Sequence, residues 1–218
     1  MSFGYKTAWF AARTDDATAL AHVLGLHNPT PMPAQAATAA AYESQRGKAF
    51  ITPALDGWTL AMSSDFLDLA DGSPPRFLEL LRQASARLAT EVQFFASYRV
   101  VETHAWARAA NGEVHRAYLY DGCSGETTLD LGPPTPQEIA LDHRFFDPSS
   151  PAAQHDAYWQ RTDLRFPDEK DVVQVAGRWS IDPSVEKPMA DGFLANLDAP
   201  RAAPSPPPVA DKPWWRFW

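Results

Sequence analysis

Cysteine is almost absent from this chain, because Cys123 is the only one among 218 residues. A single thiol cannot form a disulfide within the chain. A thiol nucleophile also needs a base, and the only histidine within ten residues is His115, on the preceding predicted strand. We therefore expect Cys123 to be an ordinary loop residue.

Long apolar runs and an excess of basic residues are missing too. No segment approaches about eighteen uninterrupted apolar residues, so the sequence excludes an ordinary transmembrane helix. Residues 1–6 lack a basic region followed by an apolar run, so we expect no conventional signal peptide and a cytoplasmic location. The formal net charge of −8 argues against nucleic-acid binding and permits a basic protein partner.

Signatures of common catalytic sites are missing as well. The sequence has no phosphate-binding loop, no G-x-G-x-x-G after a predicted strand, no nucleophile elbow and no H-E-x-x-H. His22 and His27 lie on either side of a predicted helix end, which would direct their imidazoles apart. We therefore expect no catalytic residue, no cofactor and no metal.

The signals that are present alternate between strand and helix, as in an α+β domain. Hydrophobic residues make up 45% of the chain, which is typical of a globular protein with a substantial core. The first half predicts strand 5–13, a helix ending at Gly25, strands 48–55 and 58–63, a helix with its buried stripe at Phe77, Leu81, Ala84 and Leu88, and strand 92–97. This order predicts an antiparallel sheet with the split β-α-β arrangement of ferredoxin-like folds.

Prolines modify this pattern at two places. Pro29, Pro31 and Pro33 break the chain ahead of an alanine-rich stretch, 34–42, which predicts a short helix. Pro53 lies within the predicted strand 48–55, and proline has no N–H to donate to a neighbouring strand. We therefore expect strand 48–55 at an edge of the sheet.

The clearest local signal is an added β-hairpin. Residues 101–109 and 113–120 flank Asn111-Gly112, a dipeptide well suited to a two-residue turn. With such a turn Arg108 lies opposite His115, and side chains alternate between the two faces of the sheet. One face then carries His104, Trp106, Arg108 and His115, and the other carries Ala105, Ala107, Val114, Arg116, Tyr118 and Tyr120.

The face with His104, Trp106, Arg108 and His115 is a candidate partner-binding surface. Trp and Arg dominate the binding energy of protein interfaces, so Trp106 is a candidate anchor and Arg108 a candidate for gripping a carboxylate or phosphate. An enzymatic alternative is a small hydrolase or transferase in which His104 and His115, with Glu102, exchange protons. A third interpretation is a half-exposed sheet surface on which Trp106 simply packs.

Flanking helices are predicted in the second half. We expect a strand at 127–131, a helix over 136–143 after the capping box Thr135-Pro136-Gln137-Glu138, and a long surface connection over 145–166. The last helix begins after Asp168 and buries Val172, Val175, Ala176 and Trp179. These boundaries give one α+β domain over 1–183, an irregular extension over 184–198, a proline-rich linker over 199–213 and an aromatic tail over 214–218.

An acidic segment, Asp65-Phe66-Leu67-Asp68-Leu69-Ala70-Asp71, separates the predicted strand 58–63 from the next helix. The segment is typical of a solvated loop or a helical turn. Because the chain as a whole is acidic, Asp65 and Asp68 are also candidates for a surface presented to a basic partner.

Large aromatic residues crowd the end of the sequence. Residues 201–218 hold three basic residues and one acidic residue, a net charge of +2, which leaves −10 on the first 200. The tail can dock on its own domain, or it can dock on a partner protein or a second copy, as in an adaptor. It can also lie on a membrane surface, but its few basic residues would be attracted only weakly to anionic lipid. The residues expected to dock, because they would otherwise expose a large apolar surface, are Trp214, Trp215, Phe217 and Trp218.

A resemblance to a known group of proteins spans roughly residues 50–183. It rests on Leu55-Asp56-Gly57-Trp58, the stretch 94–120 with its Asn111-Gly112 turn, Pro134-Thr135-Pro136-Gln137-Glu138 and the stretch 167–183. This pattern is similar to that of uncharacterised bacterial cytoplasmic proteins, some of which resemble immunity partners of secreted antibacterial toxins. The resemblance implies a non-enzymatic protein-binding module, an immunity protein that blocks a basic toxin through an acidic surface. It transfers no catalytic residue.

Overall fold

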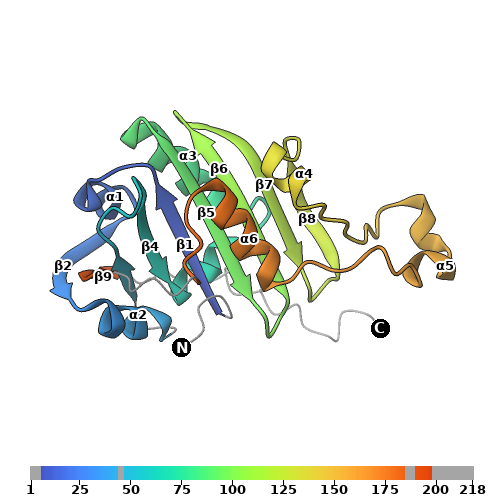
Figure 1. Cartoon of the computed structure of the whole chain (residues 1–218), viewed down its shortest axis with the longest axis horizontal. Helices are drawn as coiled ribbons and strands as arrows, with labels where there is room; N and C mark the ends of the chain where they lie inside the picture. Colours follow the sequence, from blue (N-terminus) through green and yellow to red (C-terminus); the bar gives the residue numbers. More distant parts are fainter. Residues whose placement is uncertain (1–5, 44–46, 185–189, 198–218) are drawn as a thin grey trace, which may run out of the picture.

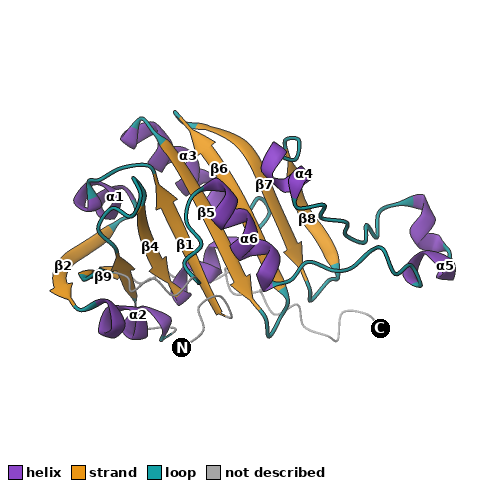
Figure 2. Cartoon of the chain, in the orientation of Figure 1, coloured by secondary structure: helices purple, strands orange, loops and turns teal. Residues whose placement is uncertain are grey.

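A nine-stranded antiparallel sheet forms the centre of the molecule, with helices on both of its faces (Figures 1 and 2). The computed structural model describes residues 6–43, 47–184 and 190–197. Neighbouring strands follow the order β2-β9-β3-β4-β1-β5-β6-β7-β8. The predicted α+β class with a large antiparallel sheet is therefore confirmed.

The strands are β1 (Lys6–Ala12), β2 (Leu26–Met32), β3 (Lys48–Ile51), β4 (Thr59–Ser63), β5 (Glu91–Tyr98), β6 (Thr103–Ala110), β7 (Glu113–Asp121), β8 (Glu126–Leu131) and β9 (Gly192–Leu197). The α-helices are α1 (Ala17–Val23), α2 (Ala34–Tyr42), α3 (Arg76–Leu88), α4 (Pro136–Ala140), α5 (Asp156–Trp159) and α6 (Glu169–Trp179). Two 3-10 helices, η1 (Ser64–Ala70) and η2 (Pro151–Gln154), complete the described elements.

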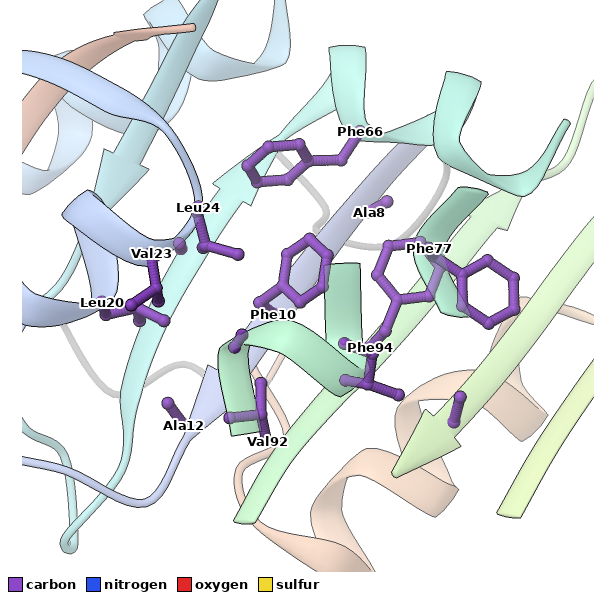
Figure 3. Packing of buried hydrophobic residues seen from close by; sticks show 14 of the residues in the cluster. Ala8, Phe10, Ala12, Leu20, Val23, Leu24, Phe66, Phe77, Val92 and Phe94 are labelled. Atoms are coloured by element: carbon purple, nitrogen blue, oxygen red, sulfur yellow. The ribbon is translucent and has the colours of Figure 1, made fainter. Parts of the chain in front are cut away.

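The hydrophobic core has two parts, one on each face of the sheet, and helices cover both. On one face, α1 and α3 bury Leu20 and Phe77 against Phe10 and Phe94 of the strands (Figure 3). On the other face, α2 and α6 pack on the sheet, and Val172 of α6 is fully buried there. We call these the α1/α3 face and the α2/α6 face. The predicted helical stripes are thus the contacts that hold both helix layers to the sheet.

The two longest helices begin in different ways: α6 begins after Asp168 as predicted, whereas α3 begins after Pro75 without a side-chain cap. Pro75 precedes α3 in an extended conformation, and a proline there costs no helical hydrogen bond. The Asp168 carboxylate caps α6 by accepting hydrogen bonds from the N–H groups of Lys170 and Asp171, and the Asp171 carboxylate in turn accepts from the N–H of Asp168. This reciprocal capping box ties the connection before α6 to its first turn.

The expected irregular extension over 184–198 contains a strand. β9 lies inside the sheet, paired with β2 on one side and β3 on the other. The expectation was wrong because this short strand is stabilised by partners more than 140 residues earlier, such as Phe50 opposite Leu194. Gly192 fits the close approach, since a Cβ there would lie 2.2 Å from the Ile51 carbonyl oxygen.

Proline positions explain two further differences from the predicted strands. β3 is an interior strand between β4 and β9, not an edge, because it ends at Ile51 before Pro53 is reached. β2 forms despite Pro29 and Pro31, because it lies at the edge of the sheet and pairs only with β9. An edge strand tolerates residues that cannot donate a hydrogen bond on its outer side.

The β6–β7 hairpin turns at Asn111-Gly112 as predicted. Asn111 has a φ of 52° and Gly112 a φ of 86°, the left-handed conformation that a tight two-residue turn requires. The Gly112 N–H donates to the Ser85 hydroxyl at 3.0 Å, so the turn is fixed to the end of α3. The hairpin therefore extends the sheet beyond β5, and its strands pack against α3.

The register of this hairpin differs from the prediction by one residue. Arg108 pairs with Arg116, not with His115, because a β-bulge beside the turn leaves His115 as an extra residue. A one-residue slip moves the following side chains to the opposite face. Trp106 therefore lies opposite Tyr118 on the α2/α6 face, and His115 stands exposed at the bulge.

The connection between α4 and α6 extends away from the sheet as an arm that carries η2 and α5 (Figure 1). Its aromatic side chains pack on one another: Phe146 meets Tyr158 with ring centroids 5.6 Å apart and stacks on Trp159 at 5.4 Å. The predicted long surface connection is thus anchored by Tyr158, which is buried, while Trp159 is 41% exposed.

Candidate functional site

Trp106, the predicted anchor of a binding surface, is buried in the α2/α6 face. Its ring stacks on Tyr118 with centroids 4.3 Å apart, and its indole N–H donates to the Glu138 carboxylate at 2.8 Å. Burial raises the pKa of Tyr118 to about 12, so this phenol stays protonated beside the indole. Only 1% of Trp106 is exposed, so it cannot contact a partner.

Glu138 accepts hydrogen bonds from three donors, two of which are on the sheet and connect α4 to it. It accepts from Trp106, from the Arg116 guanidinium at 3.0 Å, and from the Thr135 N–H at 2.8 Å as part of the predicted capping box. Arg116 and Glu138 are almost completely buried, and Arg116 also pairs with Asp130. The sequence predicted the cap but not the ion pair, because the bulge that moves Arg116 to this face leaves no sequence signature.

His104 is the middle member of a hydrogen-bonded chain that joins Ser97, His104 and Glu102. Its Nδ1 is 3.3 Å from the Ser97 hydroxyl, and its Nε2 is 3.1 Å from a Glu102 carboxylate oxygen. Serine, histidine and carboxylate are the groups of a hydrolytic triad. Ser97 and His104 are both 0% exposed, however, so no substrate can reach the hydroxyl in this conformation.

The four predicted residues of the hairpin face are not brought together as a surface. Arg108 donates to Glu91 at 2.9 Å and lies over the Trp179 ring, whereas His115 is exposed at the bulge. His115 is exposed while His104 is completely buried, so the two histidines do not form a shared site. The expected common face of His104, Trp106, Arg108 and His115, on which both interpretations depended, is therefore not formed.

Asp65 and Asp68 instead line the concave feature that we call the acidic hollow, which has a volume of about 620 Å³. It lies at one end of the sheet, between η1, the start of α3 and the ends of β5 to β8. Its charged lining residues are four aspartates, Asp65, Asp68, Asp71 and Asp121, and one lysine, Lys6. The negative charges therefore outnumber the positive one.

Hydrogen bonds position the acidic residues around this hollow. The Ser63 hydroxyl accepts from the Asp65 N–H at 3.1 Å, and a carboxylate oxygen of Asp65 accepts from the Gly47 N–H at 2.8 Å. On the opposite side, the Asp121 carboxylate accepts from the Cys123 N–H at 3.0 Å. Within the described part of the chain, the side chains of Asp68 and Asp71 take part in no ion pair, so their charge is available to a ligand.

Apolar and polar groups complete the lining. Leu67, Val101 and Leu119 contribute apolar surface, and Tyr98 contributes an aromatic ring. Ser64 also lines the hollow; it is 3% exposed, and its hydroxyl has no hydrogen-bond partner among the residues that the structure describes. A ligand with cationic groups, apolar surface and a hydrogen-bond donor matches these features.

The hollow combines residues that sequence reasoning found with residues that it missed. Of the two conformations expected for this segment, a solvated loop or a helical turn, the structure has the second, because Asp65 and Asp68 lie on the 3-10 helix η1. Asp121 was missed, since it reaches the hollow only through the β6–β7 hairpin. Over the ranges 6–43, 47–184 and 190–197, no three His, Cys, Asp or Glu side chains are arranged as a metal site would need.

The expected docking residues of the tail, Trp214, Trp215, Phe217 and Trp218, lie outside the described residues. In the part of the chain that is described, no helix combines the length and the apolar character needed to cross a membrane.

Comparison with known proteins gives no relative from which a role can be transferred. No protein-family model, no curated protein and no solved structure matches the chain.

Proposed function

We propose that this chain is a non-enzymatic binding protein whose acidic hollow receives a basic segment of a partner protein. The observation that carries the proposal is the concentration of four aspartates around a concavity of about 620 Å³ with a partly apolar lining. Complementary charge speeds association and excludes acidic competitors, while the apolar lining adds affinity. The partner-binding role predicted for Asp65 and Asp68 is kept, and the role predicted for Trp106 is not.

We further propose that the partner is a basic toxin and that the chain acts as an immunity protein. An inhibitor of this kind needs no chemistry of its own, because covering the toxin's active site is sufficient. The resemblance of residues 50–183 to immunity partners and the −10 charge of the first 200 residues support this narrower role.

We also propose that the strands around the hollow belong to a ferredoxin-like split β-α-β unit. Its four strands would be β3, β4, β1 and β5, which are neighbours in that order, with α1 and α3 on one face. In this arrangement η1 is the connection from β4 to α3. The hollow would thus be formed by a connection of this four-stranded unit and by the added β6–β7 hairpin.

Peptide binding tests the proposed role of the hollow. A fluorescein-labelled lysine-rich peptide should bind the full chain, and Asp68→Asn/Asp71→Asn should weaken binding roughly tenfold at low salt, because each lost charge pair is worth up to about 1 kcal/mol. Fluorescence anisotropy measures the affinity. The matched control Asp15→Asn/Asp56→Asn removes the same charge from exposed sites elsewhere and should stay within about twofold of the parent. Equal losses in both variants would contradict a specific site.

Growth protection tests the immunity role. The chain should be co-expressed in a sensitive host with the product of any secreted-toxin gene that adjoins its own gene. We expect restored growth with the parent chain and with the Asp15→Asn/Asp56→Asn control, and loss of protection with Asp68→Asn/Asp71→Asn. Protection that survives the hollow variant would exclude the hollow as the toxin-binding surface.

A further inference from the structure

The chain leaves the sheet beside the acidic hollow. Leu197, the last residue of β9, donates its N–H to the Gly47 carbonyl at 2.8 Å, and the Gly47 N–H donates to the Asp65 carboxylate at 2.8 Å. Asp65 in turn lines the hollow. The segment that follows Leu197 therefore begins two hydrogen bonds away from the hollow.

The composition of that segment complements the lining. Lys212 and Arg216 carry the cations that the four aspartates would attract, and three tryptophans follow within the last five residues. A tryptophan ring offers apolar surface for Leu67 and Leu119 of the lining.

The length of the segment allows this contact within one chain. Lys212 lies fifteen residues beyond Leu197, a span of up to about 50 Å when extended. Six prolines between residues 199 and 214 favour extended backbone. A tethered segment has a local concentration on the order of millimolar near its attachment point, so even a contact too weak to form between separate molecules would be populated.

We propose that the segment Lys212–Trp218 docks in the acidic hollow of its own chain and competes with the partner for it. The inference rests on the proposed function, because it assigns an internal competitor to the same hollow. Partner binding would then require the segment to leave, and a more basic or longer partner segment would displace it.

The single cysteine provides a probe at the hollow. Cys123 is exposed, and its N–H bonds the Asp121 carboxylate of the lining. A bimane fluorophore attached to Cys123 in the full chain reports contact with tryptophan, which quenches it. We expect at least twofold brighter bimane in Trp214→Phe/Trp215→Phe/Trp218→Phe, which keeps aromatic rings but removes the quenchers. Trp159→Phe, on the arm, is the control and should leave the brightness unchanged.

Charge variants test whether the hollow is the docking site. Lys212→Ala/Arg216→Ala and Asp68→Asn/Asp71→Asn should each relieve the quenching. Salt at about 0.5 M should relieve it too, because it screens the attraction between exposed charges. Asp15→Asn/Asp56→Asn should not. Brightness that is the same in the parent and in the tryptophan variant would overturn the proposal. Quenching that grows with protein concentration would also overturn it, because the contact would then join two copies.

The peptide titration separates this inference from the proposed function. If both hold, Lys212→Ala/Arg216→Ala should bind the lysine-rich peptide several-fold more tightly than the parent does. Peptide binding without tryptophan quenching would overturn the internal competitor and leave the proposed function standing. Quenching without peptide binding to any variant would mean that the hollow serves only the chain's own segment, and the proposed function would be wrong.

Discussion

The α1/α3 face and the α2/α6 face of the same sheet are stabilised by different kinds of interaction. On the α1/α3 face, Phe10, Phe77 and Phe94 form a chain of ring contacts with centroids 4.6 to 5.0 Å apart. On the α2/α6 face, aromatic rings surround ionised groups, and the buried Arg116–Glu138 pair is the centre of that arrangement. Among the described residues, all buried Arg, Asp and Glu side chains lie with the second face.

This difference means that the two faces should respond to different changes. Burying apolar surface is non-directional, so the α1/α3 face should depend mainly on the volume that its side chains fill. A buried charge needs particular partners, because an unpaired one pays the full cost of leaving water. The α2/α6 face should therefore depend on charge and on hydrogen-bond geometry even where volume is unchanged.

The largest effect is expected for Glu138→Gln. This variant keeps the shape of the side chain but leaves Arg116 without its buried counterion, and it replaces one acceptor with an amide donor that faces other donors. We expect a loss of about 3 to 5 kcal/mol in the free energy of unfolding, measured by urea denaturation. The control Glu79→Gln breaks an ion pair with Arg82 on the surface of α3 and should leave the urea midpoint unchanged. A Glu138→Gln midpoint equal to the parent's would refute the central role of the pair.

On the α1/α3 face, Leu81 should show the opposite sensitivity. Leu81 is 0% exposed on α3, and Leu81→Ala should cost about 3 kcal/mol because it leaves a cavity in the core. Leu81→Met conserves volume and should cost less than about 1.5 kcal/mol. The same urea measurements apply. If the methionine variant lost as much stability as the alanine variant, volume would not be the governing property of this face.

Features that depend on neighbouring residues in the sequence were predicted on both faces. The stripes of α3 and α6, the Asn111-Gly112 turn and the Thr135 capping box follow from residue spacing, because the interactions are local. The α1/α3 face needs little more than such spacing, since any apolar side chain of suitable size can pack there.

Pairing between residues far apart in the sequence accounts for the features that were predicted wrongly or missed. A single bulge at His115 reverses the facing of Arg116 and Tyr118, and neither residue carries a local signal of it. β9 depends on β3 and β2, which lie far earlier in the chain, so its own six residues did not indicate an interior strand. The acidic hollow was half predicted for the same reason: Asp65 and Asp68 are only three residues apart in one segment, whereas Asp121 lies at the end of β7 and reaches the hollow through the hairpin.

The smallest effect, and the one most specific to the α2/α6 face, concerns pH. His143 packs near Trp106 and Phe145, with its Nε2 3.2 Å from an Asp171 carboxylate oxygen but without hydrogen-bond geometry. Burial lowers the pKa of His143 below its usual 6.5, and the nearby charge of Arg165 lowers it further. The carboxylates of Asp171, Glu138 and Asp168 raise the pKa but do not reverse the shift.

The sign of the pH effect follows from proton binding. Above pH 6.5 His143 is neutral in both the folded and unfolded chains, whereas below it the unfolded chain binds a proton that the folded chain resists. The His143 contribution to stability is therefore present above pH 6.5 and is lost as the pH falls toward the lowered folded-state pKa. His143→Phe and His143→Gln cannot bind this proton, so the drop in melting temperature between pH 7.5 and 5.5 should be smaller in both variants than in the parent. A parent-like drop in both would show that the charged histidine is accommodated, and the α2/α6 face would then tolerate a new charge where a partner carboxylate, that of Asp171, is already close.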